Sequence, residues 1–210
     1  MNNLAATLLA QSRYAEAQKL FEEVVEIKAR TLGRDHPDTL LSINNLAAML
    51  MNLGHLDEAR KLLEEAIERN RERLGPNHPE TLKSIGSLAW TLVVSADPKL
   101  RDPARGIELA KEVTDKAPKD GNNWNTLGVA YYRAGDWKKA LATLEKSAEL
   151  RAGGDSFDWF FLAMTHWQLG HKDEARKWYD KAVAWMEKNR PEDKEFLQFR
   201  GEAAKLLQVK

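Results

Sequence analysis

NNLA, at residues 2–5, is repeated without change at residues 44–47. When residues 2–43 are compared with residues 44–85, 21 of the 42 positions are identical. Self-similarity at a fixed period of this length is typical of solenoids, in which each unit buries its apolar face only against its neighbours. The repeat therefore predicts a chain built from stacked units of one kind.

Within one repeat, the apolar residues follow the spacing of two helices. Leu46 and Leu50 lie four residues apart, and a second apolar series with the same spacing begins at Ala59. Gly54 lies between the two series and allows the chain to turn. We therefore expect each unit to be a pair of antiparallel helices, with the second helix of this unit ending at about Arg73.

A shorter repeat follows residue 85. Residues 124–131, WNTLGVAY, fit the pattern W-x2-L-G-x2-Y, and residues 159–166 repeat that frame 35 positions later. On these motifs the chain resembles the tetratricopeptide repeat proteins. The first two units, with their LG, HP and TL motifs at residues 32–40 and 74–82, resemble the 42-residue repeats of kinesin light chains. The later units resemble tetratricopeptide segments attached to bacterial protein kinases.

The resemblance implies an all-α fold, a right-handed superhelical solenoid of about five helix-turn-helix units with a capping helix at the C-terminus. One solenoid is expected over residues 1–210. Its units are expected at residues 1–36, 37–78, 79–118, 119–154 and 155–190, with the capping helix at 192–208. In the last helix, Phe196 and Phe199 begin an apolar side that shields the end of the stack, and charged residues cover the other side.

The third unit departs from the pattern at residues 93–105, VVSADPKLRDPAR. This connection is longer than a standard join between paired helices. Pro98 and Pro103 both prevent one helix from running through it. We therefore expect a protruding loop here.

The resemblance also implies where a ligand would bind, because the first helix of each tetratricopeptide unit lines a concave groove. Positions five, nine, twelve and thirteen of that helix are expected to point into the groove, together with position two. An asparagine there can pair with the backbone of an extended peptide, as kinesin light chains are understood to do with cargo peptides. Asn45, one position further on, is expected to have a structural role instead. The candidate peptide-groove residues are Asn2, Asn44, Met51, Asn52, Trp90, Asn125, Tyr132, Arg133, Phe160, Met164 and Trp167.

These candidates predict a protein or peptide partner with hydrophobic or aromatic side chains. The groove positions become more aromatic toward the C-terminus, and aromatic and Met side chains are common anchors at interfaces. Arg133 could pair with a carboxylate of the ligand. Tryptophan and tyrosine in such repeats also pack between helices, so each aromatic candidate has a purely structural interpretation as well.

Composition argues against several other functions. Lys+Arg 32 balances Asp+Glu 32, so the chain has no global positive charge to hold nucleic acid. No long apolar run predicts a membrane span, and the absence of cysteine excludes disulfides and thiolate sites. We expect a cytoplasmic protein that binds neither nucleic acid nor membranes.

Catalytic and metal-binding motifs are also missing from the sequence. No nucleophile elbow, Walker loop or dinucleotide-binding glycine motif occurs, so no enzyme activity and no cofactor are expected. His36 and His78 recur in equivalent HP loops, where a capping hydrogen bond explains them better than a shared metal. His55, His166 and His171 do not form a zinc motif, so no metal site is expected.

Two alternative functions stay open. The first helix begins at about the fifth position of its unit, so the chain could be a regulatory or targeting arm of a larger enzyme, such as a bacterial protein kinase. Alternatively, it could be a self-assembling or designed repeat scaffold that forms a homo-oligomer through the uncapped N-terminal unit.

Overall fold

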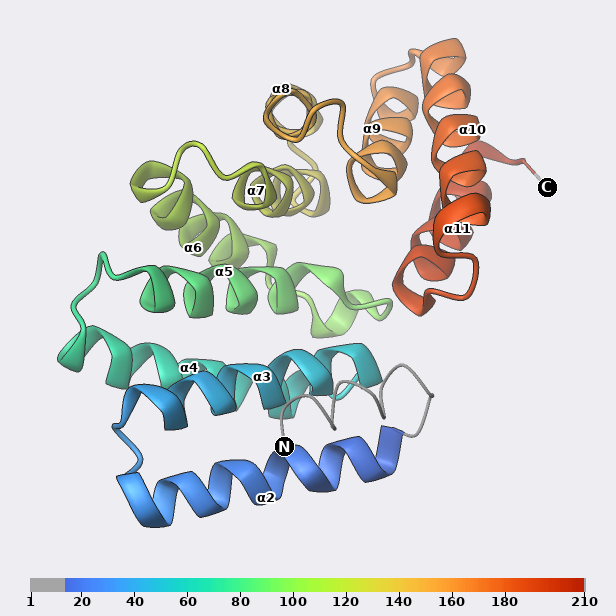
Figure 1. Ribbon diagram of the computed structural model, residues 1–210. Helices are drawn as coiled ribbons and strands as arrows, with labels where there is room; N and C mark the ends of the chain where they lie inside the picture. The colour runs from blue at the N-terminus through green and yellow to red at the C-terminus, as the bar shows by residue number, and fades with distance from the viewer. Residues whose placement is uncertain (1–13, 210) are drawn as a thin grey trace. The chain divides into compact units, whose positions relative to one another are not determined.

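The computed structural model describes residues 14–209, apart from the side chains of Tyr14, Ala15 and Asn52, and all its regular elements are helices (Figure 1). The chain divides into two compact units, residues 1–91 and 92–210. The boundary between the units falls inside helix α5, which spans Pro79–Val94.

The N-terminal unit contains three complete described helices and most of α5. These helices are α2 (Tyr14–Leu32), α3 (Pro37–Leu53) and α4 (Leu56–Arg73). Helix α3 packs against both α2 and α4, and Leu40, Ile43 and Ala66 form a buried cluster between α3 and α4. Helix α4 ends at Arg73, as the sequence predicts.

The C-terminal unit contains the end of α5, a short 3-10 helix and six α-helices. The 3-10 helix is η1 (Pro98–Leu100), and the α-helices are α6 (Pro103–Lys116), α7 (Gly121–Arg133), α8 (Trp137–Leu150), α9 (Ser156–Gln168), α10 (Lys172–Asn189) and α11 (Lys194–Leu207). Helix α7 packs against α6 and α8, and α9 packs against α8, α10 and α11. Within this unit, α7 with α8 and α9 with α10 form consecutive helical pairs, and α11 follows them.

The ends of the helices follow from local chemistry. Gly54 ends α3 in a left-handed conformation with a φ of 81°, which glycine adopts without steric cost, and its N–H donates to the Met51 carbonyl at 2.9 Å. In the C-terminal unit an aspartate side chain caps the start of each helix except α10, and the capping residues are Asp97, Asp102, Asp120, Asp136, Asp155 and Asp193.

Equivalent small residues let the paired helices approach closely. Four of the second helices, α2, α4, α8 and α10, have an alanine near their start, and these alanines, Ala17, Ala59, Ala140 and Ala175, all have an exposed fraction of 0%. In the fourth pair, a Cβ atom added to Gly128 of α7 would lie 2.6 Å from Leu144 Cγ of α8. Glycine at this position is therefore required for the close packing of α7 on α8.

Two further expectations concern the connection between the two helices of the third pair and the last helix of the chain. Residues 96–100 are exposed, as expected for a loop between α5 and α6, although Pro98–Leu100 form a 3-10 turn within it. Helix α11 buries Phe196 and Phe199 completely, and it contacts α9 and α10, as expected for a capping helix (Figure 1).

Candidate peptide-binding surface

The first asparagine of the second NNLA motif, Asn44, is buried, whereas the sequence predicts that it faces a groove. Asn44 in α3 has an exposed fraction of 7%, and its Oδ1 accepts a hydrogen bond from Ser84 Oγ of α5 at 3.0 Å. Ser84 also receives a long hydrogen bond from Asn70 Nδ2 of α4, at 3.4 Å. Asn44 therefore joins one helical pair to the first helix of the next pair, which is the structural role that the sequence assigned to Asn45.

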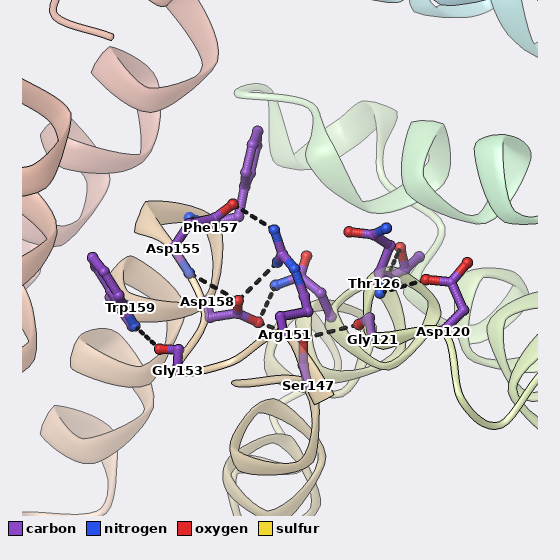
Figure 2. A network of polar contacts seen from close by, with 12 residues as sticks. Asp120, Gly121, Thr126, Ser147, Arg151, Gly153, Asp155, Phe157, Asp158 and Trp159 are labelled. Atoms are coloured by element: carbon purple, nitrogen blue, oxygen red, sulfur yellow. Dashed lines mark hydrogen bonds and ion pairs between the residues drawn. The ribbon is translucent and has the colours of Figure 1, made fainter. Parts of the chain in front are cut away.

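Asn125 makes the equivalent connection in the C-terminal unit. Its side chain has an exposed fraction of 5%, and its Nδ2 donates to Asp158 Oδ1 of α9 at 3.0 Å. Ser147 Oγ donates to the same carboxylate oxygen at 2.5 Å, and Arg151 Nη1 donates to Asp158 Oδ2 at 2.7 Å. Figure 2 shows this network from close by. Asn125, like Asn44, is therefore buried and joined to the next helical pair by a hydrogen bond.

Three side chains, Asn125, Ser147 and Arg151, donate hydrogen bonds to the Asp158 carboxylate, which has no access to water. Its side chain is fully buried, and this burial raises the pKa of the carboxyl group, against the opposing influence of Ser147, Arg151 and Asn125. Arg151 also forms an ion pair with Asp155, the residue that caps α9. The network thereby joins α7, α8 and the start of α9.

The sequence did carry a signal for both connections. Ser84 and Asp158 each lie two residues before position five of the following first helix, where a polar side chain meets the asparagine of the preceding pair. An apolar residue would be expected at a simple packing position, so a polar residue there indicates a buried hydrogen bond.

Phe160 and Met164 also belong to the core rather than to an open surface. Phe160 has an exposed fraction of 0%, and its ring packs edge-on against Tyr179 of α10, with 6.1 Å between the ring centroids. Met164, one turn later in α9, is equally enclosed. Both were expected to line the groove, but α9 has almost no exposed face, because four other helices, α7, α8, α10 and α11, pack around it.

Arg133 is paired within the chain, although it was a candidate partner for a ligand carboxylate. The Arg133 side chain in α7 has an exposed fraction of 5%, and its Nη1 donates to Glu202 Oε2 of α11 at 2.6 Å. Arg101 contacts the other oxygen of Glu202 at 3.4 Å. Burial, and then the neighbouring charge of Arg133, lower the pKa of Arg101. The capping helix therefore supplies the carboxylate that we had expected from a ligand.

The remaining described candidates are partly accessible. Met51 lies seven residues after Asn44, Tyr132 lies seven after Asn125, and Trp167 lies seven after Phe160, so these three residues occupy the same position, position twelve, of three first helices. All three side chains are half-buried. Trp90, near the end of α5, is half-buried as well. Asn2 and the side chain of Asn52 lie outside the described residues.

Tyr132 and Trp167 each have an aromatic face and a polar neighbour. The Tyr132 ring packs edge-on against Phe161, with 5.6 Å between centroids, and burial raises the pKa of its hydroxyl, which is hydrogen-bonded to Gln168. The ammonium group of Lys172 lies 5.0 Å from the centroid of the Trp167 ring. Such half-exposed rings beside polar groups are chemically suited to contact with a partner.

The histidines of the HP loops act as the sequence predicts. The Nδ1 atom of His36 accepts a hydrogen bond from the Asp38 N–H at 3.2 Å, and the Nδ1 atom of His78 accepts one from the Glu80 N–H at the same distance. Both therefore satisfy a backbone donor in the first turn of a helix.

Among the described residues, membrane-spanning helices and groups of three or more metal ligands are both missing. Across residues 14–209, no helix combines the length and apolar character that a membrane-spanning helix requires. In the same part of the chain, no three His, Cys, Asp or Glu side chains gather closely enough to hold a metal ion.

Comparison with solved structures finds the same architecture. The nearly identical TPR-like repeats assigned to a kinesin light chain of Podosopora anserina match with a TM-score of 0.70 and 25% identity, over 90% of this chain and 94% of that chain. A thermophilic TPR protein of Thermus thermophilus matches with a TM-score of 0.67 and 21% identity, over 99% of this chain and 97% of that chain. These matches confirm the expected fold class of helical pairs with a C-terminal capping helix.

Family models extend this likeness to the sequence. Two models described as tetratricopeptide repeat match residues 1–38 and 39–80, and residues 120–188. No curated protein matches the chain. The likeness to repeats attached to bacterial protein kinases stays a prediction. Because the matched segments together make up more than half of the sequence, the chain belongs to the tetratricopeptide repeat family.

Proposed function

We propose that this protein is an interaction module whose position-twelve side chains contact extended peptides with apolar or aromatic residues. The observation that carries this proposal is the shared half-burial of Met51 in the N-terminal unit and of Tyr132 and Trp167 in the C-terminal unit. A side chain must be rigidly held and also accessible to anchor a partner, and half-burial meets both conditions.

Membership of the family supports the broad class of this function. Tetratricopeptide repeats generally form non-enzymatic scaffolds that bind other proteins. The structural similarity to kinesin light chain repeats is consistent with a peptide ligand. The proposal narrows this class to the position-twelve side chains Met51, Tyr132 and Trp167, taken separately in each unit, and to one kind of peptide.

The charges of the C-terminal unit favour an apolar peptide over an acidic one. Glu202 already lies between Arg133 and Arg101, so those two guanidinium groups are not open to the carboxylate of a ligand. Tyr132 and Trp167 instead offer ring surface, with the Tyr132 hydroxyl and Gln168 as polar groups. We therefore expect aromatic or aliphatic ligand side chains to dominate recognition.

The proposal is tested with peptides selected from a random display library against the intact chain. Their affinity is measured by fluorescence anisotropy for the natural sequence and for Trp167→Ala and Met51→Ala. A hot-spot aromatic residue contributes about 2 kcal/mol or more, so Trp167→Ala should weaken binding by about thirtyfold for peptides that bind the C-terminal unit.

Trp137→Ala is the matched control. Trp137 is the first residue of α8, a second helix, and has an exposed fraction of 37%, so its loss removes an accessible tryptophan outside the position-twelve row. Circular dichroism verifies that each variant is folded. Equal affinity of the natural protein, Trp167→Ala and Met51→Ala for every selected peptide would exclude Trp167 and Met51 as peptide contacts.

The two alternatives from the sequence stay predictions. No feature of the described residues favours a regulatory arm of a larger enzyme over an independent module. Self-assembly through the first unit depends on residues 1–13, which lie outside the described part of the chain. The cytoplasmic location is likewise a prediction.

A further inference from the structure

Two imidazole rings face each other where α9 ends and α10 begins. His166 lies in the last turn of α9, and His171 is the residue that precedes α10. Their Nδ1 atoms are 3.3 Å apart, and their ring centroids are 5.6 Å apart. Neither histidine is a position-twelve residue, although His166 directly precedes Trp167 and Lys172 directly follows His171.

A hydrogen bond between the two Nδ1 atoms is one way to hold the rings in this arrangement. A neutral imidazole has one protonated and one unprotonated ring nitrogen, so one Nδ1–H can donate to the other Nδ1 atom. His171 makes no capping hydrogen bond to the first turn of α10, unlike His36 and His78, whose Nδ1 atoms each accept from a backbone N–H. The Nδ1 atom of His171 is thus close to the Nδ1 atom of His166, which is a second nitrogen of the kind that binds metal ions.

The separation of the two nitrogens matches that of two ligands on one metal ion. Zinc–nitrogen bonds are about 2.0–2.1 Å long, so two of them at a tetrahedral angle place the nitrogens about 3.3–3.4 Å apart. From this geometry we infer that His166 and His171 chelate a divalent transition-metal ion, such as Zn²⁺, Ni²⁺ or Cu²⁺, through their Nδ1 atoms. The sequence alone predicts no metal site, so this inference departs from that expectation.

The surroundings of the pair favour a cation. His166 has an exposed fraction of 9%, so its ring is largely shielded from bulk solvent. His171 is exposed, so an ion can reach the site from solvent. The carboxylates of Glu145 and Glu174 lie near enough to His166 to act on its charge.

Only two protein ligands are in place. Glu174 in the first turn of α10 is paired with Lys177 at 2.6 Å, so water fills the remaining coordination positions unless Glu174 leaves that pair. When both rings are neutral, binding needs one proton to move from Nδ1 to Nε2 of the same ring, so both Nδ1 lone pairs face the ion and no proton is lost overall. Imidazole suits all three metals, and their relative affinity follows the order Ni²⁺ below Cu²⁺ and Cu²⁺ above Zn²⁺.

The chain contains its own control for this site. His55 precedes α4 as His171 precedes α10, and neither side chain caps its helix. The His55 N–H donates to the Leu50 carbonyl just as the His171 N–H donates to the His166 carbonyl. Leu50 therefore occupies the place of His166, so the His55 site has one imidazole, together with a nearby Glu58 at 3.8 Å.

The test titrates Zn²⁺, Ni²⁺ or Cu²⁺ into the intact, tag-free protein and measures binding by calorimetry and by the ring NMR signals of the histidines. We expect one ion per chain, perturbed signals of His166 and His171, and loss of this binding in His171→Ala and in His166→Leu, which copies Leu50. His55→Ala should bind as the natural protein does. Retention of the natural affinity by folded His171→Ala, loss of it in His55→Ala, or no saturable binding of any of the three ions would overturn the inference.

Discussion

Arg133 Nη1 of α7 donates to Glu202 Oε2 of α11 at 2.6 Å, and this ion pair joins residues 69 positions apart in the sequence. The Arg133 side chain is almost completely buried, so its positive charge is stabilised by that one carboxylate and by the Val93 carbonyl. The carbonyl accepts a hydrogen bond from Nε at 3.2 Å. The capping helix is thus fixed to the rest of its unit by charge as well as by its phenylalanines.

Glu202→Gln is expected to destabilise the C-terminal unit. Removing one partner of a buried ion pair leaves the other charge uncompensated, at a cost of about 3–5 kcal/mol, and the partial exposure of Glu202 places the expected loss at about 2–3 kcal/mol. Urea unfolding followed by tryptophan fluorescence reports on this unit, because residues 92–210 contain all tryptophans except Trp90. Glu187→Gln, which breaks the more exposed pair with Arg200, should change stability by less than about 1 kcal/mol, and an equal loss in both variants would contradict this account.

Asn44→Ala is expected to reduce stability without weakening peptide binding. The substitution removes one buried hydrogen bond to Ser84, whose hydroxyl can still donate to the Glu80 carbonyl, so the loss should be about 1 kcal/mol. Hydrogen exchange of α3 and α5 amides measures the stability, and anisotropy measures the affinity. Loss of peptide affinity in a folded Asn44→Ala variant would contradict this prediction and show that Asn44 contributes to the binding surface.

His166 should make the stability of the C-terminal unit depend on pH. Its pKa in the folded state lies below the ordinary value of 6.5, so the unfolded chain binds a proton more readily, and the stabilisation present above pH 6.5 is lost as the pH falls below it. Urea midpoints of the natural protein and of His166→Leu are measured from pH 8 to pH 5 without metal ions. As the pH falls, the midpoint of the natural protein should decrease relative to that of the variant, so that the two midpoints converge or cross. Parallel curves would show that His166 does not titrate in this way.

Gly128→Ala should destabilise the packing of α7 on α8. The new Cβ atom would lie 2.6 Å from Leu144 Cγ and 3.2 Å from the Leu144 backbone nitrogen, so side chain and backbone would both have to shift, at about 1–3 kcal/mol. Gly201→Ala in α11 is the control, since no atom lies within 4 Å of its added Cβ, and alanine should stabilise that helix by up to about 1 kcal/mol. Thermal unfolding of both variants compares them directly, and a neutral Gly128→Ala would refute the close-packing argument.

The sequence predicted the helices well because their signals are local. Gly54 permits the left-handed turn that ends α3, and His36 and His78 carry the acceptor that the next helix start needs, whatever surrounds them. The recurring alanines and Gly128 mark positions where only a small side chain fits between paired helices, and these positions repeat with the unit.

The binding surface was predicted less well. Periodicity identifies which side of a helix a residue lies on, but it does not show what packs against that side. Asn44 and Phe160 were both placed on an inner face from their register, and both are covered, one by Ser84 of the next pair and the other by Tyr179 of α10.

The sequence alone thus determined the repeat, the helical pairs and the capping helix, because apolar spacing, glycine turns and helix caps act over a few residues. Tertiary structure alone decided which polar groups remain free for a ligand. Asn125 is occupied by Asp158 and Arg133 by Glu202, and the partners lie 33 and 69 residues away. The physical reason is that burial forces each polar side chain to find a partner, and that partner is set by which helices meet in space.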